Sequence, residues 1–301
     1  MIYATGAVQD LPVIGDWVVV TRGGSGDRLQ IQAVLPRKSL LARRAIESDH
    51  EAQLLAANVD HVFVVSSLNH DLNPRRLERY RVLVDQSGTD GTLLLTKTDL
   101  VSKVEERQSL MQSVQHIFPC LSISSLDGSG MEDLLARLHP GSTFVFLGSS
   151  GVGKSTLINR LLGHEKQATF GVRESDSRGR HTTSSRSLMA MPNGALLIDT
   201  PGIRELALWN LDEAALTESF DELGGLAEMC RFRDCKHESE PGCSVQLAID
   251  NGSLSRSRLE SYRKLQKEQA FYERRADKNK QSAEKAKWKS IHKAMRKHNK
   301  Q

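Results

Sequence analysis

Eight residues in the middle of the chain, Gly148–Ser155, have the sequence of a phosphate-binding loop. They read GSSGVGKS and fit the pattern G-x-x-x-x-G-K-S/T. In such a loop, backbone N–H groups surround the β-phosphate at a helix N-terminus, where negative charge is favoured. Lys154 would reach the β- and γ-phosphates and assist catalysis, and the Ser155 hydroxyl would bind Mg²⁺. The predicted phosphate contacts are Gly148, Ser149, Ser150, Gly151, Val152, Gly153, Lys154, Ser155 and Thr156.

The flanking sequence favours this interpretation over a glycine-rich turn with a chance lysine. Thr143–Leu147 is a short apolar run, which predicts a buried strand leading into the loop. Thr156–Leu162 has helical spacing and ends at Gly163, a suitable C-cap. Strand, loop and helix therefore follow one another in the order that a phosphate-binding loop requires.

A second motif, DTPG at residues 199–202, has the composition of a segment that contacts Mg²⁺ and the γ-phosphate. It fits D-x-x-G, in which Asp199 would join the Mg²⁺ water shell and the Gly202 N–H would meet the γ-phosphate. Arg186–Met191 and Ala195–Ile198 flank a Pro-Asn-Gly turn and predict a hairpin. The second strand of that hairpin would deliver Asp199 to the site.

The segment Arg173–Ser185, between these two motifs, is polar and lacks periodicity. It fits a mobile segment that senses the γ-phosphate, and it fits an ordinary surface loop as well. Within it, Thr182 or Thr183 would complete the Mg²⁺ shell. The sequence does not decide between the two threonines.

Residues 96–99, TKTD, could read a guanine base, because they resemble the motif N/T-K-x-D. Asp99 would accept hydrogen bonds from the guanine ring N–H and exocyclic amine, which adenine cannot offer. The stem of Lys97 would cover the base or ribose. Thr96 stands where asparagine is commoner, so the hydrogen bond that braces the loop is expected to be weaker.

Ser124-Ser125 is a second candidate for base recognition, at the end of the next predicted strand. It resembles the short loop whose backbone N–H meets the guanine carbonyl oxygen. Taken alone, this pair reads as a plain turn, and the TKTD match is short enough to arise by chance. Both stretches lie at the carboxyl ends of predicted strands, where ligands bind in parallel sheets.

Three of the four cysteines gather near a histidine with the spacing C-x4-C-x-H-x5-C. Three thiolates and one imidazole make a closed tetrahedral zinc site, with no open position for catalysis. Reduced free cysteines in a loop are the alternative. The intervening sequence is too polar to fold on a core of its own, which favours a metal. The predicted ligands of one structural Zn²⁺ are Cys230, Cys235, His237 and Cys243.

The nucleotide motifs need an alternating run of strands and helices to position them, and the sequence predicts one. Apolar runs predict strands, and amphipathic stretches predict the helices between them. The strands are expected at 60–66, 92–95, 120–123 and 143–147, and the helices at 75–86, 100–116 and 131–138. This pattern is typical of a doubly wound α/β sheet.

Residues 1–45 read as short β-strands, including Trp17–Thr21 and Leu29–Leu35. They are consistent with a small, incomplete β-barrel of the oligonucleotide-binding (OB) kind, and equally with a two- or three-stranded flap on the next domain. We therefore expect three domains: an OB-like β domain at 1–45, an α/β domain at 46–215, and a zinc-binding, basic helical domain at 216–301.

The composition indicates a soluble globular chain with a basic C-terminal segment. Of 301 residues, 39% are hydrophobic and 26% charged, and no apolar run approaches a membrane span. No export signal is recognisable, so we expect a cytoplasmic protein without membrane contact. Residues 251–301 hold 16 basic and 5 acidic side chains, a net +11 against +4 for the whole chain. Such asymmetry favours a polyanionic partner.

The motifs occur in an unusual order, with the base-reading stretches before the phosphate loop. This order is a circular permutation of the usual GTPase sequence. Together with the Cys/His cluster and the basic segment, it resembles the ribosome small-subunit-dependent GTPase family of bacteria. Further matching stretches are Ile14–Val18, Ala56–Asp60 and Arg180–Thr183.

The resemblance implies an N-terminal OB-fold, a permuted GTPase domain and a C-terminal zinc domain. It also implies binding to the small ribosomal subunit and its rRNA late in maturation, GTP hydrolysis that the subunit stimulates, and GTP, GDP, Mg²⁺ and Zn²⁺ as ligands. We expect a monomer. The chain before Ile14 is shorter than a full barrel needs, which leaves the completeness of the OB-fold open.

Hydrolysis is expected to depend on a partner. Many GTPases carry a water-orienting glutamine after D-x-x-G, but this chain has Ile203. His181 is a candidate to orient or deprotonate the water, although a solvated or RNA-contacting His181 fits equally well. Ile203 also keeps open an RNA-binding assembly factor in which GTP acts mainly as a conformational switch. An ATP-dependent kinase or transporter is disfavoured by Asp99 and by the motif order.

Overall fold

The chain folds into two compact units in the computed structural model. Residues 8–22, 29–44, 52–68, 72–163, 186–199, 213–271 and 274 are described. The described residues up to Ser219 belong to the first unit, and those from Phe220 belong to the second. The domain boundaries expected from the sequence, at 45/46 and 215/216, stay predictions.

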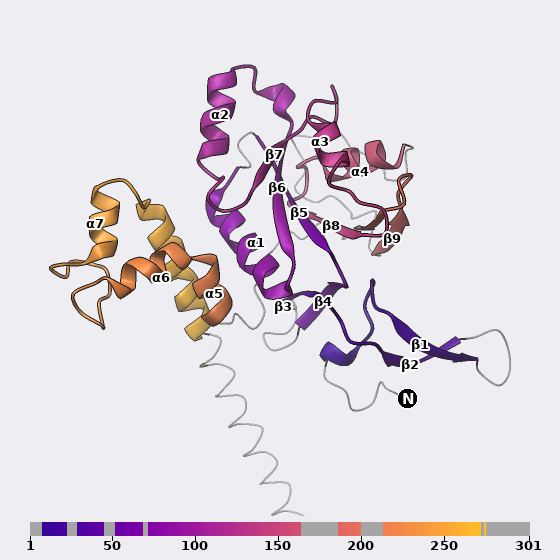
Figure 1. The fold of residues 1–301 in the computed structure, drawn as a ribbon, viewed down its shortest axis with the longest axis horizontal. Coiled ribbons are helices and arrows are strands. Elements are labelled where there is room, and N and C mark those ends of the chain that lie inside the picture. The colour runs from indigo at the N-terminus through magenta and orange to yellow at the C-terminus, as the bar shows by residue number, and fades with distance from the viewer. Residues whose placement is uncertain are drawn as a thin grey trace, which may run out of the picture. The chain divides into compact units, whose positions relative to one another are not determined.

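The first unit is built on a six-stranded sheet with the spatial order β7–β6–β5–β8–β10–β9 (Figure 1). Its strands are β5 (His61–Ser67), β6 (Asp90–Thr96), β7 (Cys120–Ser122), β8 (Thr143–Gly148), β9 (Ser187–Ala190) and β10 (Leu196–Asp199). Neighbouring strands are parallel except β9 and β10, which form the predicted hairpin. The carboxyl ends of the five parallel strands therefore meet at one edge.

Helices cover both faces of this sheet (Figure 1). They are α1 (Pro74–Ser87), α2 (Val104–Gln112), α3 (Met131–Leu135) and α4 (Lys154–Leu162), and α5 (Glu213–Ser219) packs against α1. Phe63 and Phe146 from the sheet share one buried cluster with Leu134 of α3 and Leu157 of α4. These side chains are 2% exposed or less, so this face of the sheet is closed to water.

Local sequence signals explain where α1 begins and ends. Asn73 accepts the Arg76 N–H at the N-cap, Pro74 occupies the first turn, and Gly88 ends the helix with φ of 73°. The sequence predicted one helix over residues 100–116, but α2 covers only Val104–Gln112. Val114 and Ile117 are buried in turns that follow α2, so tertiary packing ends the helical pattern there.

The link between α3 and β8 is held by the β9–β10 turn. The Asn193 side-chain amide donates to the Leu138 carbonyl at 2.7 Å. The Gly141 N–H donates to the Gly194 carbonyl at 2.9 Å, and the Leu196 N–H to the Ser142 carbonyl at 2.8 Å. The connection that creates the permuted order is therefore fixed by hydrogen bonds.

Asn193→Ala should lower the free energy of unfolding by about 1 kcal/mol, because the Leu138 carbonyl loses its donor. Asn193→Asp keeps the oxygen that accepts the Ala195 N–H. It should still destabilise at least as much, because a carboxylate oxygen then faces a carbonyl. Urea unfolding of the full chain measures both variants. Unfolding midpoints equal to the wild type for both would show that the turn does not secure this connection.

The N-terminal part of the first unit consists of two antiparallel hairpins. Strands β1 (Val18–Arg22) and β2 (Leu29–Val34) form one two-stranded sheet, and β3 (Leu40–Arg44) and β4 (Ala52–Ala57) form another. The sequence predicted the first pair and not the second. The described residues form no closed barrel, and the OB-fold stays a prediction.

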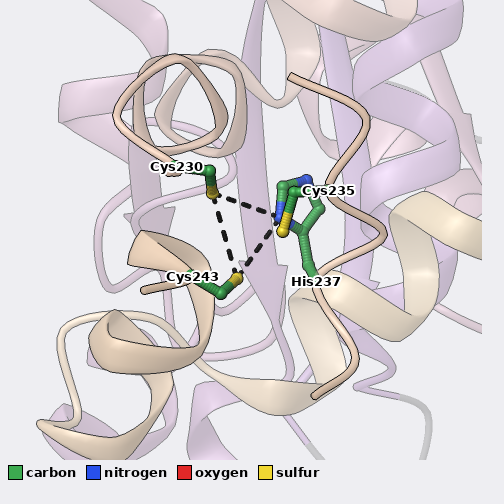
Figure 2. Close-up of side chains that lie close together, drawn as sticks. All are labelled: Cys230, Cys235, His237 and Cys243. Atoms are coloured by element: carbon green, nitrogen blue, oxygen red, sulfur yellow. Dashed lines mark hydrogen bonds between the residues drawn. The ribbon is translucent and has the colours of Figure 1, made fainter. Parts of the chain in front are cut away.

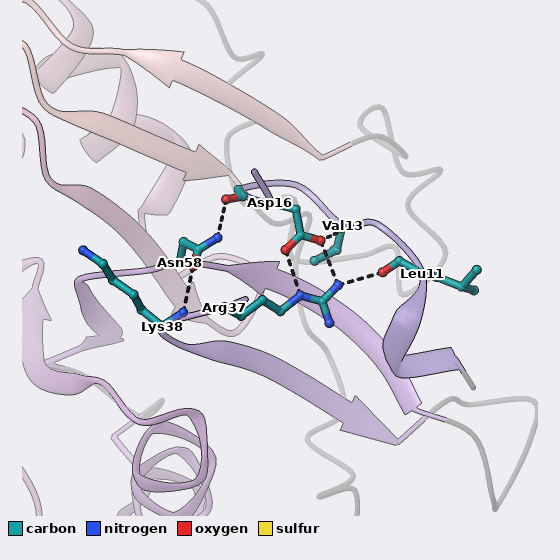
Figure 3. Close-up of polar contacts among 7 residues, drawn as sticks. Leu11, Val13, Asp16, Arg37, Lys38 and Asn58 are labelled. Atoms are coloured by element: carbon teal, nitrogen blue, oxygen red, sulfur yellow. Dashed lines mark hydrogen bonds and ion pairs between the residues drawn. The ribbon is translucent and has the colours of Figure 1, made fainter. Parts of the chain in front are cut away.

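A buried ion pair fixes the chain at the base of the first hairpin (Figure 3). The Asp16 carboxylate accepts two hydrogen bonds from Arg37, at 2.7 and 2.8 Å, and one from the Val13 N–H at 2.8 Å. The Asn58 side chain donates to the Gly15 carbonyl and accepts the Lys38 N–H. Two of the sequence stretches that support the family resemblance, 14–18 and 56–60, thus lie side by side.

The second unit contains α6 (Asp221–Glu228), α7 (Ser244–Asp250) and a helix over residues 256–271. Arg258 is 4% exposed, lies 4.0 Å above the Phe220 ring and pairs with Glu222 at 2.6 Å. A buried guanidinium needs such a partner, so this pair stabilises the helix contact. Residues 275–301, the greater part of the basic C-terminal segment, lie outside the described residues. No helix in the described part of the chain is long and apolar enough to span a bilayer.

Candidate nucleotide and zinc sites

The predicted phosphate loop connects β8 to α4 at the carboxyl edge of the sheet. Gly148 is required there, because an added Cβ would lie 2.3 Å from the Val65 carbonyl oxygen of β5. Val152 is 1% exposed and anchors the loop in the core. The N-cap residue Gly153 has φ of 94° and contributes no capping side chain, so the first N–H groups of α4 are left for an anion.

Lys154 stands at the start of α4 and reaches back over the loop. Its ammonium donates to the carbonyl oxygens of Gly148 and Ser149, both at 2.6 Å. The cation therefore lies within the loop, where it can neutralise phosphate charge. Ser155 follows in the first helical turn, as the motif requires.

The base-reading stretch after β6 is hydrogen-bonded to the phosphate loop. The Thr96 hydroxyl donates to the Val152 carbonyl at 2.6 Å, and the Lys97 ammonium donates to the Gly151 carbonyl at 2.8 Å. Threonine was expected to brace the loop weakly. In the structure its hydroxyl, on a residue only 2% exposed, makes a short and shielded hydrogen bond.

The two predicted base-reading stretches meet through Asp99 and Ser124. The buried Ser124 hydroxyl donates to Asp99 Oδ1 at 2.7 Å and accepts the N–H groups of Leu126 and Asp127. This fixes one carboxylate oxygen of an otherwise exposed aspartate. A carboxylate held at the strand edge can accept hydrogen bonds from a base.

The Mg²⁺ residues are only partly described. Asp199 is 7% exposed and ends β10, which pairs with the phosphate-loop strand. A carboxylate and the Ser155 hydroxyl at one sheet edge offer the oxygen ligands that Mg²⁺ prefers. The two candidate Mg²⁺ threonines, Thr182 and Thr183, lie outside the described residues. The same holds for the catalytic candidate His181 and the predicted γ-phosphate contact Gly202.

The four predicted zinc ligands converge in the second unit (Figure 2). His237 Nδ1 lies 3.5 Å from the sulfurs of Cys230 and Cys243, and these sulfurs are 3.9 Å apart. All four ligand atoms, including Cys235 Sγ, lie within 4.8 Å of one another. Metal–ligand bonds of about 2.0 to 2.3 Å give tetrahedral edges of about 3.5 to 3.8 Å, so the cluster fits Zn²⁺.

Glu240 holds the loop that carries two of these ligands. Its carboxylate accepts the N–H groups of Lys236, Glu238 and Ser239 at 2.8, 2.8 and 3.0 Å. These hydrogen bonds lower the pKa of Glu240 to about 2. The sequence does not single out this residue, because one acidic side chain in a polar loop carries no signal of what it binds.

Arg160 was missed as well. It lies six residues after Lys154 in α4 and donates to the carbonyls of Ser125 and Leu126. No motif includes it. A helical arginine on the surface usually reads as a solvated charge.

Comparison with known proteins identifies the family. Residues 34–209, more than half of the chain, match the family model described as RsgA GTPase. The chain belongs to the RsgA GTPase family. A relative from Opitutus terrae, named small ribosomal subunit biogenesis GTPase RsgA, is 43% identical over 98% of this chain and 83% of its own length. A relative from Oceanobacillus iheyensis, named small ribosomal subunit biogenesis GTPase RsgA 1, is 42% identical over 94% of this chain and 81% of its own length.

Solved structures agree with this assignment. YjeQ from Thermotoga maritima superimposes with a TM-score of 0.62 and 28% identity, over 87% of this chain and 86% of that one. YloQ, described as a circularly permuted GTPase, superimposes with a TM-score of 0.61 and 24% identity, over 87% of this chain and 82% of that one. This likeness shows a shared fold. As a member of the RsgA GTPase family, the chain is a GTP-hydrolysing enzyme with a circularly permuted GTPase fold.

Glu240→Ala should weaken zinc binding about tenfold, because three N–H groups of the ligand loop lose their acceptor. Competition between the purified full-length protein and a chromophoric zinc chelator measures this change. Glu238→Ala is the matched control, since its side chain is exposed in the same loop. Equal zinc retention by the two variants would contradict the role assigned to Glu240.

Proposed function

We propose that this chain hydrolyses GTP during biogenesis of the small ribosomal subunit, at a site that the phosphate loop and the two base-reading stretches share. The observation that carries the proposal is the pair of hydrogen bonds from Thr96 and Lys97 to the phosphate loop. They join residues 96–97 to residues 151–152, which supports one nucleotide site shared by the two stretches. The names of the relatives supply the ribosomal context.

Each part of GTP would then have its own contacts. Asp99 and the Ser125 N–H would recognise guanine, while Lys97 would cover the base or ribose. Residues 148–156 and the Gly202 N–H would bind the phosphates. Ser155, Asp199 and one of the two switch threonines would hold Mg²⁺, which, when bound, neutralises charge on the β- and γ-phosphates.

The catalytic step is proposed to wait for the ribosomal subunit. Ile203 has no polar group with which to orient water. His181, or a group of the partner, would do so in its place.

The second unit is proposed to bind rRNA as a zinc-stabilised helical domain. The exposed zinc loop carries Arg231 and Arg233, and the Arg231 guanidinium lies 5.5 Å from the Phe232 ring. The basic residues 251–301 would add phosphate contacts. An OB-like N-terminal domain, a monomeric state and a cytoplasmic location complete the proposal.

GTP turnover should be slow for the protein alone and should rise by roughly two orders of magnitude with small ribosomal subunits. Stimulation should weaken steeply between about 50 and about 200 mM salt, because phosphate contacts release counterions. Phosphate release measured with small subunits, with large subunits and without ribosomes tests this expectation.

The matched control is the same assay with large subunits, which should leave turnover near its basal rate. Equal turnover in all three conditions would contradict the proposal. It would favour the second candidate, an RNA-binding assembly factor that uses GTP mainly as a conformational switch, which Ile203 supports.

A further inference from the structure

Arg160 connects the phosphate-loop helix to the loop that follows β7. It lies in the last turn of α4, at the end of the helix away from the phosphate loop. Its Nη1 donates to the carbonyl oxygens of Ser125 and Leu126, at 2.5 and 3.0 Å. One guanidinium nitrogen therefore binds two successive peptide groups.

The N–H sides of the same two peptide groups bind Ser124. The N–H groups of Leu126 and Asp127 donate to Ser124 Oγ, at 3.2 and 3.3 Å. That hydroxyl in turn donates to Asp99 Oδ1 at 2.7 Å. A continuous chain of hydrogen bonds thus runs from the guanidinium, through two peptide dipoles, to the carboxylate proposed to read guanine.

All the hydrogen bonds in this series point in the same direction, from the guanidinium towards the carboxylate. The cation attracts both carbonyl oxygens, which orients the two peptide dipoles with their N–H groups towards the hydroxyl. A hydroxyl that accepts two N–H groups is a stronger donor and can turn its proton only towards Asp99. The loop also leaves room for the arginine, because a Cβ on Gly128 would lie 2.7 Å from Arg160 Nη2.

A simpler explanation is that Arg160 only provides positive charge near a helix C-terminus. That explanation requires no particular direction of the side chain. It does not account for the contact with two carbonyls of a loop that follows a different strand. The two explanations also differ in what they predict for base selectivity.

We propose that Arg160 is a positioning residue for guanine recognition, acting on Asp99 through the 125–127 peptide groups and Ser124. The inference rests on the proposed guanine site. Asp99 would make two hydrogen bonds to guanine and only one to hypoxanthine, which lacks the exocyclic amine. Loss of its alignment should therefore weaken guanine binding more than hypoxanthine binding.

The test is calorimetric titration of the full-length protein with GDP, IDP and ADP. Arg160→Leu should weaken GDP binding about five- to tenfold and IDP binding by about twofold or less, so that the GDP-to-IDP preference falls. Arg160→Lys, which keeps a cation and several donors, should retain most of the preference. Arg137→Leu removes an exposed arginine elsewhere in the same unit and should leave the preference unchanged.

An unchanged GDP-to-IDP preference in Arg160→Leu would overturn the inference, and so would equal losses for both nucleotides. If that variant does not fold, Arg160→Gln carries the same prediction, because it also removes the cation. A wild-type protein that does not prefer GDP to IDP and ADP would refute the proposed guanine site itself. The two failures are therefore distinguishable.

Discussion

The proposed nucleotide site depends on the hydrogen bond from the Thr96 hydroxyl to the Val152 carbonyl. Thr96 is the last residue of β6, and Val152 lies in the loop that follows β8. These two strands are not neighbours, because β5 lies between them. Without a direct link, the base-reading stretch and the phosphate loop would be positioned independently. Both residues are 2% exposed or less, so water does not compete for this bond. Lys97 adds a second link at Gly151.

The circular permutation leaves the sheet intact and changes where the chain goes next. Burial fixes the place of each strand, and the new connection needs only the short link held by the β9–β10 turn. After β10, the next element that the structure describes is α5 and not another strand of the sheet. There the Ser219 hydroxyl donates to Asp85 of α1 at 2.6 Å, directly before the second unit begins. The chain after Asp199 therefore passes through α5 into the second unit, which carries the Cys/His cluster.

Sequence patterns were sufficient where one short segment determines the structure. Continuous apolar runs predicted β5, β6 and β8, and the spacing of three cysteines and a histidine in a polar segment predicted the Cys/His cluster. Patterns were insufficient where distant residues decide. The end of α2 depends on the burial of Val114 and Ile117, and β3–β4 pairs through residues without clear alternation. Arg160 and Glu240 bind backbone groups. Every residue type other than proline carries both a backbone N–H and a carbonyl, so the sequence does not reveal these partners.

The base-reading stretch and the phosphate loop are proposed to form one site because Thr96 joins them. The most direct test is the dissociation constant for GDP of Thr96→Val, which keeps the shape of the side chain and removes the hydroxyl. Thr92→Val, a buried change on the same strand that breaks only a contact with His61, is the control. We expect about tenfold weaker GDP binding for Thr96→Val and wild-type binding for the control. Wild-type affinity in Thr96→Val would show that the two stretches do not depend on this hydrogen bond to form one site.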